Sequence, residues 1–316
     1  MGASTHDLFG NATSAEPATD GTYGEAPSRF RLPQATRLGA VHLQVADLAR
    51  SVAFYEGVLG FRLASREGSH AVLTAQGSDR ALIELHERKG AKPAGRRAQL
   101  GLYHVAILLP DRPSLGRFMR QMTASGVRVG AGDHLVSEAL YLSDPDGLGL
   151  EVYADRPRDT WQRLGRELML ATDPVDIGGL LDAAGDTPWT GMPAGTTIGH
   201  VHLHVGDIGE GARFYSEAIG FDRITWRYPG ALFLGAGGYH HHLGTNTWAG
   251  PDATSASAED ARLIAWTIEL PSEASLANVT ASLREGGYEV VRDGNRTVAE
   301  DPWGTAVAFV VDPQAR

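Results

Sequence analysis

Apolar and polar residues alternate in several short stretches of the chain, a period-two pattern that predicts strands with one polar face. The arrangement repeats, because each such stretch is followed by a run with helical spacing and then by three further strand-like runs. A repeat of this kind determines the whole fold. The four leading strands are predicted at residues 38–47, 103–111, 198–207 and 265–272.

Residues that favour helix and hairpin boundaries stand at matching places in the copies. Asp47 and Asp207 precede the helical runs as N-caps, and a glycine follows each run as a C-cap. In the second and fourth copies, Asp-Pro turns at 144–147 and 301–304 predict a hairpin between the last two strands. The sequence therefore predicts an α+β fold of four βαβββ modules.

The segment boundaries follow from the repeat. Modules are predicted at 37–98, 99–155, 196–250 and 251–316, with a connector at 156–195 between the halves. The connector is rich in Asp, Gly and Pro, and its residues 164–171 have the pattern of a short helix. Residues 1–36 are polar and rich in Gly, Ser, Thr and Ala, which predicts a mobile, disordered-like N-terminal tail that packs little.

Composition narrows the classes of function. The 316 residues suffice for two domains with substantial cores, and the absence of cysteine excludes disulfides and thiolate chemistry. The formal net charge of −10 argues against a nucleic-acid partner, and no apolar run reaches membrane-spanning length. Residues 1–36 also lack the apolar segment of a signal peptide, so we expect a cytoplasmic protein that acts on a small molecule.

Histidines give the leading strand of the third module a chemical character. His200, His202 and His204 alternate with apolar residues and so share one face of the strand. Imidazole is the commonest transition-metal ligand, so this face predicts a metal site or a polar cavity. The pattern alone leaves both open, and also a strand whose polar face lies in water.

The repeat, with a histidine at a fixed place in the leading strand, resembles the vicinal oxygen chelate superfamily over residues 37–312. This superfamily includes glyoxalase I, bleomycin-resistance proteins and extradiol ring-cleaving dioxygenases, and the chain looks most like the two-domain catechol-2,3-dioxygenase branch. The stretches that carry the resemblance are 101–104, 137–147 and 237–242. The resemblance implies two paired-module units, each a U-shaped, barrel-like mixed sheet that is able to hold one divalent metal.

The resemblance also implies where metal ligands belong, at one place in the first strand and one in the last strand of a module. In the second and third modules these places hold His104, Glu151 and His200. In the first and fourth modules they hold Ala40, Ala265 and Ala308. We therefore predict that the second module pairs with the third around the two-histidine, one-carboxylate set of non-haem Fe(II) oxygenases. The first and fourth modules would form a metal-free unit.

Other residues receive expected roles from the same resemblance. His241, in the last strand of the third module, is expected to be the acid/base group, with His242 as the alternative because neighbouring strand residues face opposite ways. Tyr141 is expected to hydrogen-bond substrate or oxygen, or else a structural partner, and His134 to support a metal ligand. His202 and His204 would touch substrate or pack in the core.

Glu84 of the first module has a sequence context like that of the glyoxalase carboxylate. No histidine stands at the matching place of its module, because His42 is two residues out of register. We interpret Glu84 as a relic or a surface charge.

Three functions follow from these residues. The leading hypothesis is an extradiol dioxygenase that uses Fe(II), with Mn(II) as the alternative metal, to open a catechol-type ring with O₂. The second is a glyoxalase-type isomerase or lyase with Ni(II) or Zn(II), in which His242 completes four protein ligands. The third is a metal-free, small-molecule-binding resistance protein. An exposed sheet edge on each module further predicts a homo-oligomer.

Overall fold

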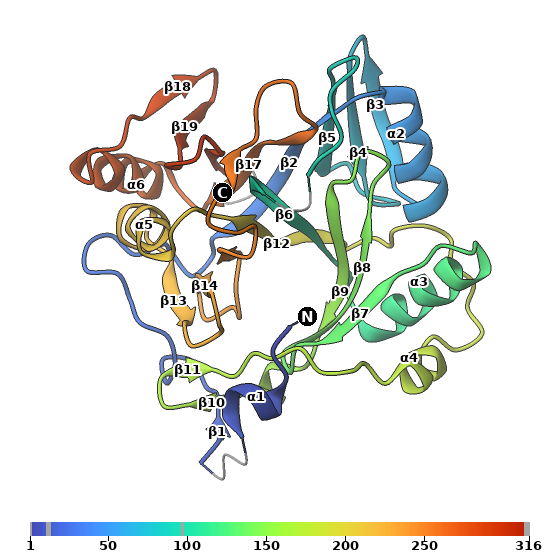
Figure 1. Ribbon diagram of the computed structural model, residues 1–316, viewed down its shortest axis with the longest axis horizontal. Helices are drawn as coiled ribbons and strands as arrows, with labels where there is room; N and C mark the ends of the chain where they lie inside the picture. The colour runs from blue at the N-terminus through green and yellow to red at the C-terminus, as the bar shows by residue number, and fades with distance from the viewer. Residues whose placement is uncertain (1, 11–13, 96–97, 313–316) are drawn as a thin grey trace.

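The computed structural model of this chain describes residues 2–10, 14–95 and 98–312. Two curled mixed sheets lie next to each other, and the longer helices lie on their outer sides (Figure 1). Buried apolar residues of both sheets belong to one continuous core. In the described part of the chain, no helix combines the length and the apolar character that crossing a bilayer requires.

The first sheet combines the second and third modules. Its strands are β6 (Gln99–Leu108), β7 (Gly130–Asp133), β8 (Ser137–Ser143), β9 (Gly149–Asp155), β12 (Thr197–His204), β13 (Asp222–Thr225), β14 (Ala231–Gly235) and β15 (Leu243–Asn246), with the short β16 (Thr254–Ser255) paired to β6. The order is β13-β14-β15-β12-β6-β9-β8-β7, so the antiparallel pair of β12 and β6 joins the two modules. The predicted pairing of the second module with the third is confirmed.

The second sheet combines the first and fourth modules. Its strands are β2 (Arg37–Val45), β3 (Arg62–Glu67), β4 (His70–Thr74), β5 (Ala81–Glu87), β17 (Arg262–Leu270), β18 (Val291–Asp293), β19 (Arg296–Glu300) and β20 (Ala306–Val311). The order is β18-β19-β20-β17-β2-β5-β4-β3, with the antiparallel pair of β17 and β2 at the centre. The predicted α+β fold of two paired-module, curved mixed sheets is confirmed.

Each module carries one helix between its first and second strands. These helices are α2 (Leu48–Phe54), α3 (Arg112–Ala124), α5 (Ile208–Gly211) and α6 (Glu273–Glu285), and α2 and α5 continue as π-helical turns over Tyr55–Leu59 and Ala212–Ile219. A side-chain oxygen caps the start of all four, from Asp47, Asp111, Asp207 and Ser272. The capping residues expected from the sequence therefore act as caps.

Two buried tyrosines connect one sheet to the other. The Tyr215 hydroxyl donates to Asp301 Oδ2 at 2.7 Å, and the Tyr55 hydroxyl donates to Asp144 Oδ2 at 3.4 Å. Each tyrosine belongs to the helical segment of one module and each aspartate to the Asp-Pro turn of the next module, which lies in the other sheet. Both contacts therefore hold the two sheets together.

The N-terminal segment packs against the first sheet, so the prediction of a tail that packs little is wrong. It forms α1 (Thr5–Phe9) and β1 (Glu16–Pro17), and β1 pairs with β10 (Gln162–Leu164). Phe9, Tyr23 and Leu32 are buried. The segment has few apolar residues, but these are spaced so that each reaches the surface of the folded modules, which average composition does not reveal.

The connector also differs from its prediction. It contains a 3₁₀ turn (Arg158–Thr160), β10, β11 (Glu167–Leu168) and α4 (Ile177–Ala183). The helix expected at 164–171 is wrong, because β11 pairs antiparallel with β10 and both Leu168 and Leu170 are buried. The only α-helix of the connector, within the described residues, is α4, which is capped by Asp176 and lies beside α3.

Candidate active site

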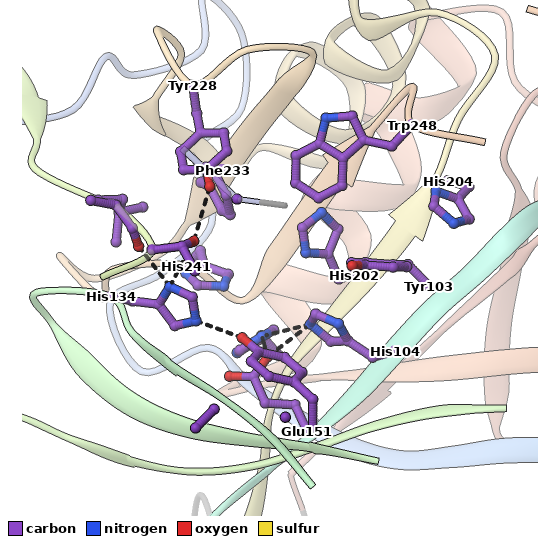
Figure 2. A pocket seen from close by; sticks show the side chains of 18 residues that line it. Tyr103, His104, His134, Glu151, His202, His204, Tyr228, Phe233, His241 and Trp248 are labelled. Atoms are coloured by element: carbon purple, nitrogen blue, oxygen red, sulfur yellow. Dashed lines mark hydrogen bonds and ion pairs between the residues drawn. The ribbon is translucent and has the colours of Figure 1, made fainter. Parts of the chain in front are cut away.

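A cavity of about 590 Å³ lies on the inner face of the first sheet. Residues of both modules line it, from β6, β8 and β9 on one side and from β12 and β14 on the other, and Gly2 of the N-terminal segment closes part of the wall. Six histidines line this cavity, namely His104, His134, His200, His202, His204 and His241. Figure 2 labels all of them except His200.

His104, Glu151 and His200 converge at one end of the cavity and are each at most 5% exposed. The Nε2 atoms of the two histidines are 3.3 Å apart, and Glu151 Oε2 lies 2.9 Å from His104 Nε2 and 3.4 Å from His200 Nε2. Strand register explains the convergence. Ala106 of β6 pairs with Glu151 on one side and with His200 on the other, and His104 lies two residues along β6 on the same face.

The geometry of these three residues fits a divalent transition metal. An ion about 2.0–2.2 Å from each ligand atom, at octahedral or tetrahedral angles, places ligand atoms about 2.9–3.5 Å apart. The separations of 2.9, 3.3 and 3.4 Å lie in this range. Burial lowers the pKa of His200 to about 4, which leaves its imidazole neutral at physiological pH. His200 Nδ1 is buried and makes no hydrogen bond within the described residues.

Glu151 stays ionised in this setting. Burial acts to raise the pKa of its carboxyl, but the neighbouring His200 and His104 outweigh burial and hold that pKa well below its usual value. Two imidazoles and one carboxylate are the donor set that leaves open positions on a non-haem iron. The site can therefore bind a metal and still admit further ligands.

Tyr141 is held in place by His134. Since the Ala171 carbonyl only accepts, His134 Nδ1 donates to it at 2.7 Å, and His134 Nε2 then accepts from the Tyr141 hydroxyl at 2.5 Å. Tyr141 pairs with Glu151 across β8 and β9, so its hydroxyl lies beside the cluster. Burial, with the charge of Glu151, raises the pKa of Tyr141 well above its usual value. His134 was expected to support a metal ligand, and its hydrogen bonds within the described residues run to Tyr141, the Ala171 carbonyl and Thr172.

A chain of hydrogen bonds ends at His241. Asp155 Oδ1 accepts from His240 Nε2 at 2.9 Å, and the Nδ1 atoms of His240 and His241 are 2.7 Å apart. Because a carboxylate only accepts, His240 carries its proton on Nε2, and His241 Nδ1 must be the donor to His240 Nδ1. His241 Nε2 is therefore left with a lone pair.

His241 itself lines the cavity, with its ring centroid 4.1 Å from that of His200. Burial lowers the pKa of His241 well below its usual value, so the neutral ring is ready to accept a proton on Nε2. The sequence pointed to His241 but not to His240 and Asp155 behind it. The only available signal was the run of three histidines itself.

His242 faces away from the cavity. Its Nδ1 accepts from the Ala236 backbone N–H at 3.2 Å, and its ring stacks on Phe221. The three histidines lie in a bend directly before β15 and not inside the strand, and successive residues there still face opposite ways. The structure therefore contradicts both roles suggested for His242, as the alternative acid/base group and as a fourth metal ligand.

His202 and His204 line the cavity and are fixed by Asn246. His204 Nδ1 donates to Asn246 Oδ1 at 2.6 Å, and Asn246 Nδ2 donates to His202 Nε2 at 2.9 Å. Asn246 lies in β15 and pairs with His204 across the sheet. Of the two expected placements, these histidines take the one facing the cavity.

Four aromatic side chains form much of the remaining wall, namely Tyr103, Tyr228, Phe233 and Trp248. Figure 2 shows Tyr228, Phe233 and Trp248 at the end of the cavity opposite Glu151. Tyr103 and Trp248 are 40% and 41% exposed, so the aromatic wall reaches the cavity mouth. The sequence did not indicate these residues, because their convergence depends on turns and on segments far apart in the chain.

Comparison with known proteins agrees with this description. A curated relative, catechol-2,3-dioxygenase of Bacillus subtilis (strain 168), is 45% identical over 281 residues, covering 87% of this chain and 98% of the relative. A crystal structure of a candidate dioxygenase from Bacillus subtilis is 13% identical and superimposes with a TM-score of 0.61, covering 90% of this chain and 87% of the other.

The crystal structure of glyoxalase I from Zea mays is 20% identical, with a TM-score of 0.53 and coverage of 88% and 92%. At these identities the two solved structures support the fold alone. The sequence profile described as Glyoxalase/Bleomycin resistance protein/Dioxygenase superfamily matches residues 37–152 and 197–313, which is most of the chain. With two matched segments, a fold of paired modules and a 45% identical relative, the chain belongs to the Glyoxalase/Bleomycin resistance protein/Dioxygenase superfamily.

Proposed function

We propose that this protein is an iron(II)-dependent extradiol dioxygenase that opens catechol-type rings with O₂. The observation that carries the proposal is the convergence of His104, His200 and Glu151 in one cavity whose wall also holds His241 and Tyr141. The relationship to catechol-2,3-dioxygenase supports the same chemistry. Iron bound by these three residues would supply a Lewis acid and a common meeting point for a catecholate and O₂.

The substrate side of the cavity suits a flat aromatic molecule. Tyr228, Phe233 and Trp248 offer apolar ring faces and edges, and the volume of about 590 Å³ lies within the range of small-molecule sites. The buried walls would exclude bulk water from the ring, while the mouth beside Tyr103 and Trp248 leaves an entrance. We therefore infer a catechol that can carry a substituent, oriented with its two hydroxyl groups toward Glu151.

Proton movement is assigned to His241. The bond from its Nδ1 to His240, which in turn donates to Asp155, keeps the lone pair on His241 Nε2. That atom would take the proton of a substrate hydroxyl and return it to a product oxygen. Tyr141 donates its own proton to His134, so its oxygen lone pairs are free to accept a hydrogen bond from substrate. Positioned proton transfer of this kind typically contributes about 10²–10⁴-fold in rate.

The test is turnover by the purified protein. Ferrous iron is first loaded into the protein under anaerobic conditions, and oxygen and substrate are then added. Oxygen consumption and a coloured ring-fission product with a panel of catechols are expected, and reconstitution with Mn(II) compares the two metals. Absence of turnover across the panel in iron-loaded protein would refute the proposed reaction. His104→Ala should lose iron and activity together, whereas His242→Gln, which alters a histidine outside the cavity, should keep both. A His104→Ala protein that retains iron and full activity would refute the ligand assignment.

Self-association also stays a prediction. The outermost strands of the two sheets are β7, β13, β3 and β18, and within the described residues β7 and β13 each form a bridge at the outer edge, to Asp173 and Glu25. The outer edges of β3 and β18 are therefore the ones that remain open to self-association. Light scattering on the eluting protein would measure its mass in solution, and a monomer at every concentration would contradict the expected homo-oligomer.

A further inference from the structure

A second group of metal-ligating side chains lies in the other sheet, in the unit that the sequence had suggested would be metal-free. His42 is in β2, His70 is in β4, and Glu84 and His86 are in β5. The parallel pair of β2 and β5 sets His42 opposite Glu84, and the antiparallel pair of β4 and β5 sets His70 opposite His86. Since side chains alternate along a strand, all four lie on one face of the sheet.

Two of the three separations within this group match those around a bound metal. His42 Nδ1 lies 3.3 Å from His86 Nε2 and 3.5 Å from Glu84 Oε2. One ligand atom from each of the three residues lies within 4.8 Å of the others, as is also true of His104, Glu151 and His200. Ligand atoms around a tetrahedral zinc ion are about 3.3–3.5 Å apart, given bonds of about 2.0–2.1 Å. The side chains therefore need little rearrangement to close around an ion.

The group is not a copy of the first site. Glu84 occupies the place of Glu151, because it pairs with His42 across parallel strands as Glu151 pairs with Ala106. The first-strand place that holds a histidine in the second and third modules is Ala40 here, and His42, two residues later, supplies the histidine instead. His86 supplies a second histidine. All the ligands come from one module, whereas the first site takes ligands from two.

The surroundings of the group favour neutral ligands. Burial lowers the pKa of His42, and it lowers the pKa of His86 to about 4, which favours the neutral imidazoles. His70 Nε2 lies 2.9 Å from Glu84 Oε2 and can donate to that carboxylate, which orients it as outer-shell partners of metal ligands do.

One positive charge opposes a cation in this place. Arg296 Nη1 lies 3.5 Å from His42 Nε2, which is the nitrogen on the far side of the ring from Glu84 and His86. Arg296 is also paired with Asp293 at 2.7 Å, and its side chain is partly exposed, so it can turn toward solvent. Its charge should weaken metal binding without blocking the ligand atoms.

We propose that His42, Glu84 and His86 form a second divalent-metal site of the zinc type, with His70 holding Glu84 and one coordination position open. The site borders a cavity of about 640 Å³ on the inner face of the second sheet. The walls of this cavity include His42, Glu84 and Arg296. Two histidines and one glutamate with an open fourth position form a common zinc donor set. The inference does not depend on the reaction proposed for the first site.

The test is the number of Zn²⁺ ions bound per full-length chain, measured by equilibrium dialysis and elemental analysis. His86→Gln should bind one ion fewer than the wild type. His6→Ala, which alters an exposed histidine in α1, is the matched control and should bind as many as the wild type. Circular dichroism confirms that each variant is folded. If folded His86→Gln binds as many ions as the wild type, the proposal is overturned.

Affinity provides a second, independent readout. His70→Gln should weaken Zn²⁺ binding at this site by about 10–100-fold, as loss of an outer-shell partner does. Arg296→Ala should tighten binding, because it removes the opposing charge. Both effects should persist in protein whose first site has been disabled by Glu151→Ala. Unchanged affinity in both variants would also overturn the proposal.

Discussion

Replacing Asp155 by alanine tests how the protein sets the tautomer of His241, the proposed acid/base group. In the intact chain Asp155 Oδ1 accepts the His240 Nε2 proton at 2.9 Å, and this leaves His240 Nδ1 to accept from His241. Without the carboxylate, the His240 Nε2–H has no partner in a buried place, and His240 gains by moving its proton to Nδ1. His241 must then carry its proton on Nε2, where it is no longer able to act as a base.

The size of the effect follows from the cost of the unpaired group. A buried donor without a partner costs about 1–3 kcal/mol, and this is the free energy that shifts the tautomer balance. At about 1.36 kcal/mol per factor of ten, the productive tautomer and kcat should fall about 5–150-fold. Iron content should not change, because the change lies two residues behind the cluster along the hydrogen-bond chain.

The assay is kcat with a saturating catechol, at matched iron content, for the wild type and three variants. Asp155→Asn keeps an oxygen that can accept from His240 and should recover most of the activity. Tyr239→Phe removes the other hydrogen bond to Asp155 Oδ1, at 3.2 Å, and should stay near wild type. Full activity in Asp155→Ala would refute the reasoning, as would an Asp155→Asn protein that is equally impaired, since the lost charge would then be responsible.

Three further outcomes can be measured directly. Gly199→Ala would place its Cβ 1.8 Å from Tyr153 Oη, so the free energy of unfolding in urea should fall by about 1–3 kcal/mol. Gly57→Ala meets open space and should show no such loss. Equal stabilities of the two variants would contradict the close packing at Gly199. Burial raises the pKa of Asp144 to about 7, so the folded state binds the carboxyl proton more tightly than the unfolded state does. The free energy of unfolding should therefore fall by up to about 4 kcal/mol as pH rises from about 4 to 7. Asp144→Asn should remove that slope, and a parallel pH profile in the two proteins would argue against the buried carboxyl as its source. Removal of residues 2–9 should raise KM for catechols more than it lowers kcat, because Gly2 closes part of the cavity wall. Steady-state constants equal to those of the full chain would show that the segment does not shape the site.

The sequence was sufficient for the fold because the fold is a repeat. Helix caps stand at the same place in each copy and Asp-Pro turns at matching places in the second and fourth, so weak local patterns support one another. The unequal distribution of histidines among the copies then predicted which modules share a sheet. His104, Glu151 and His200 could be compared across copies, and their convergence followed from register without knowledge of side-chain packing.

Features outside the repeat were not predictable in the same way. The contact between His240 and Asp155 depends on the bend before β15. The conformation of this bend also determines that His241, and not its neighbour His242, faces the cavity. The second cluster was missed because His42 departs from the register by two residues, while its partners come from β4 and β5. Packing of the N-terminal segment depends on complementary surfaces that exist only after the modules have folded.

The pairing of the first module with the fourth gives the chain a problem during its synthesis. The roughly 220 residues between β2 and β17 take about 10–40 s to make at about 5–20 residues per second. Through that interval the central edge of β2, which carries the buried Val41, Leu43 and Val45, has no partner strand and is open to pairing with another nascent chain. All the strands of the first sheet emerge before β17 does. The half that holds His104, Glu151 and His200 can therefore be finished on the ribosome while the other half still waits for its last module.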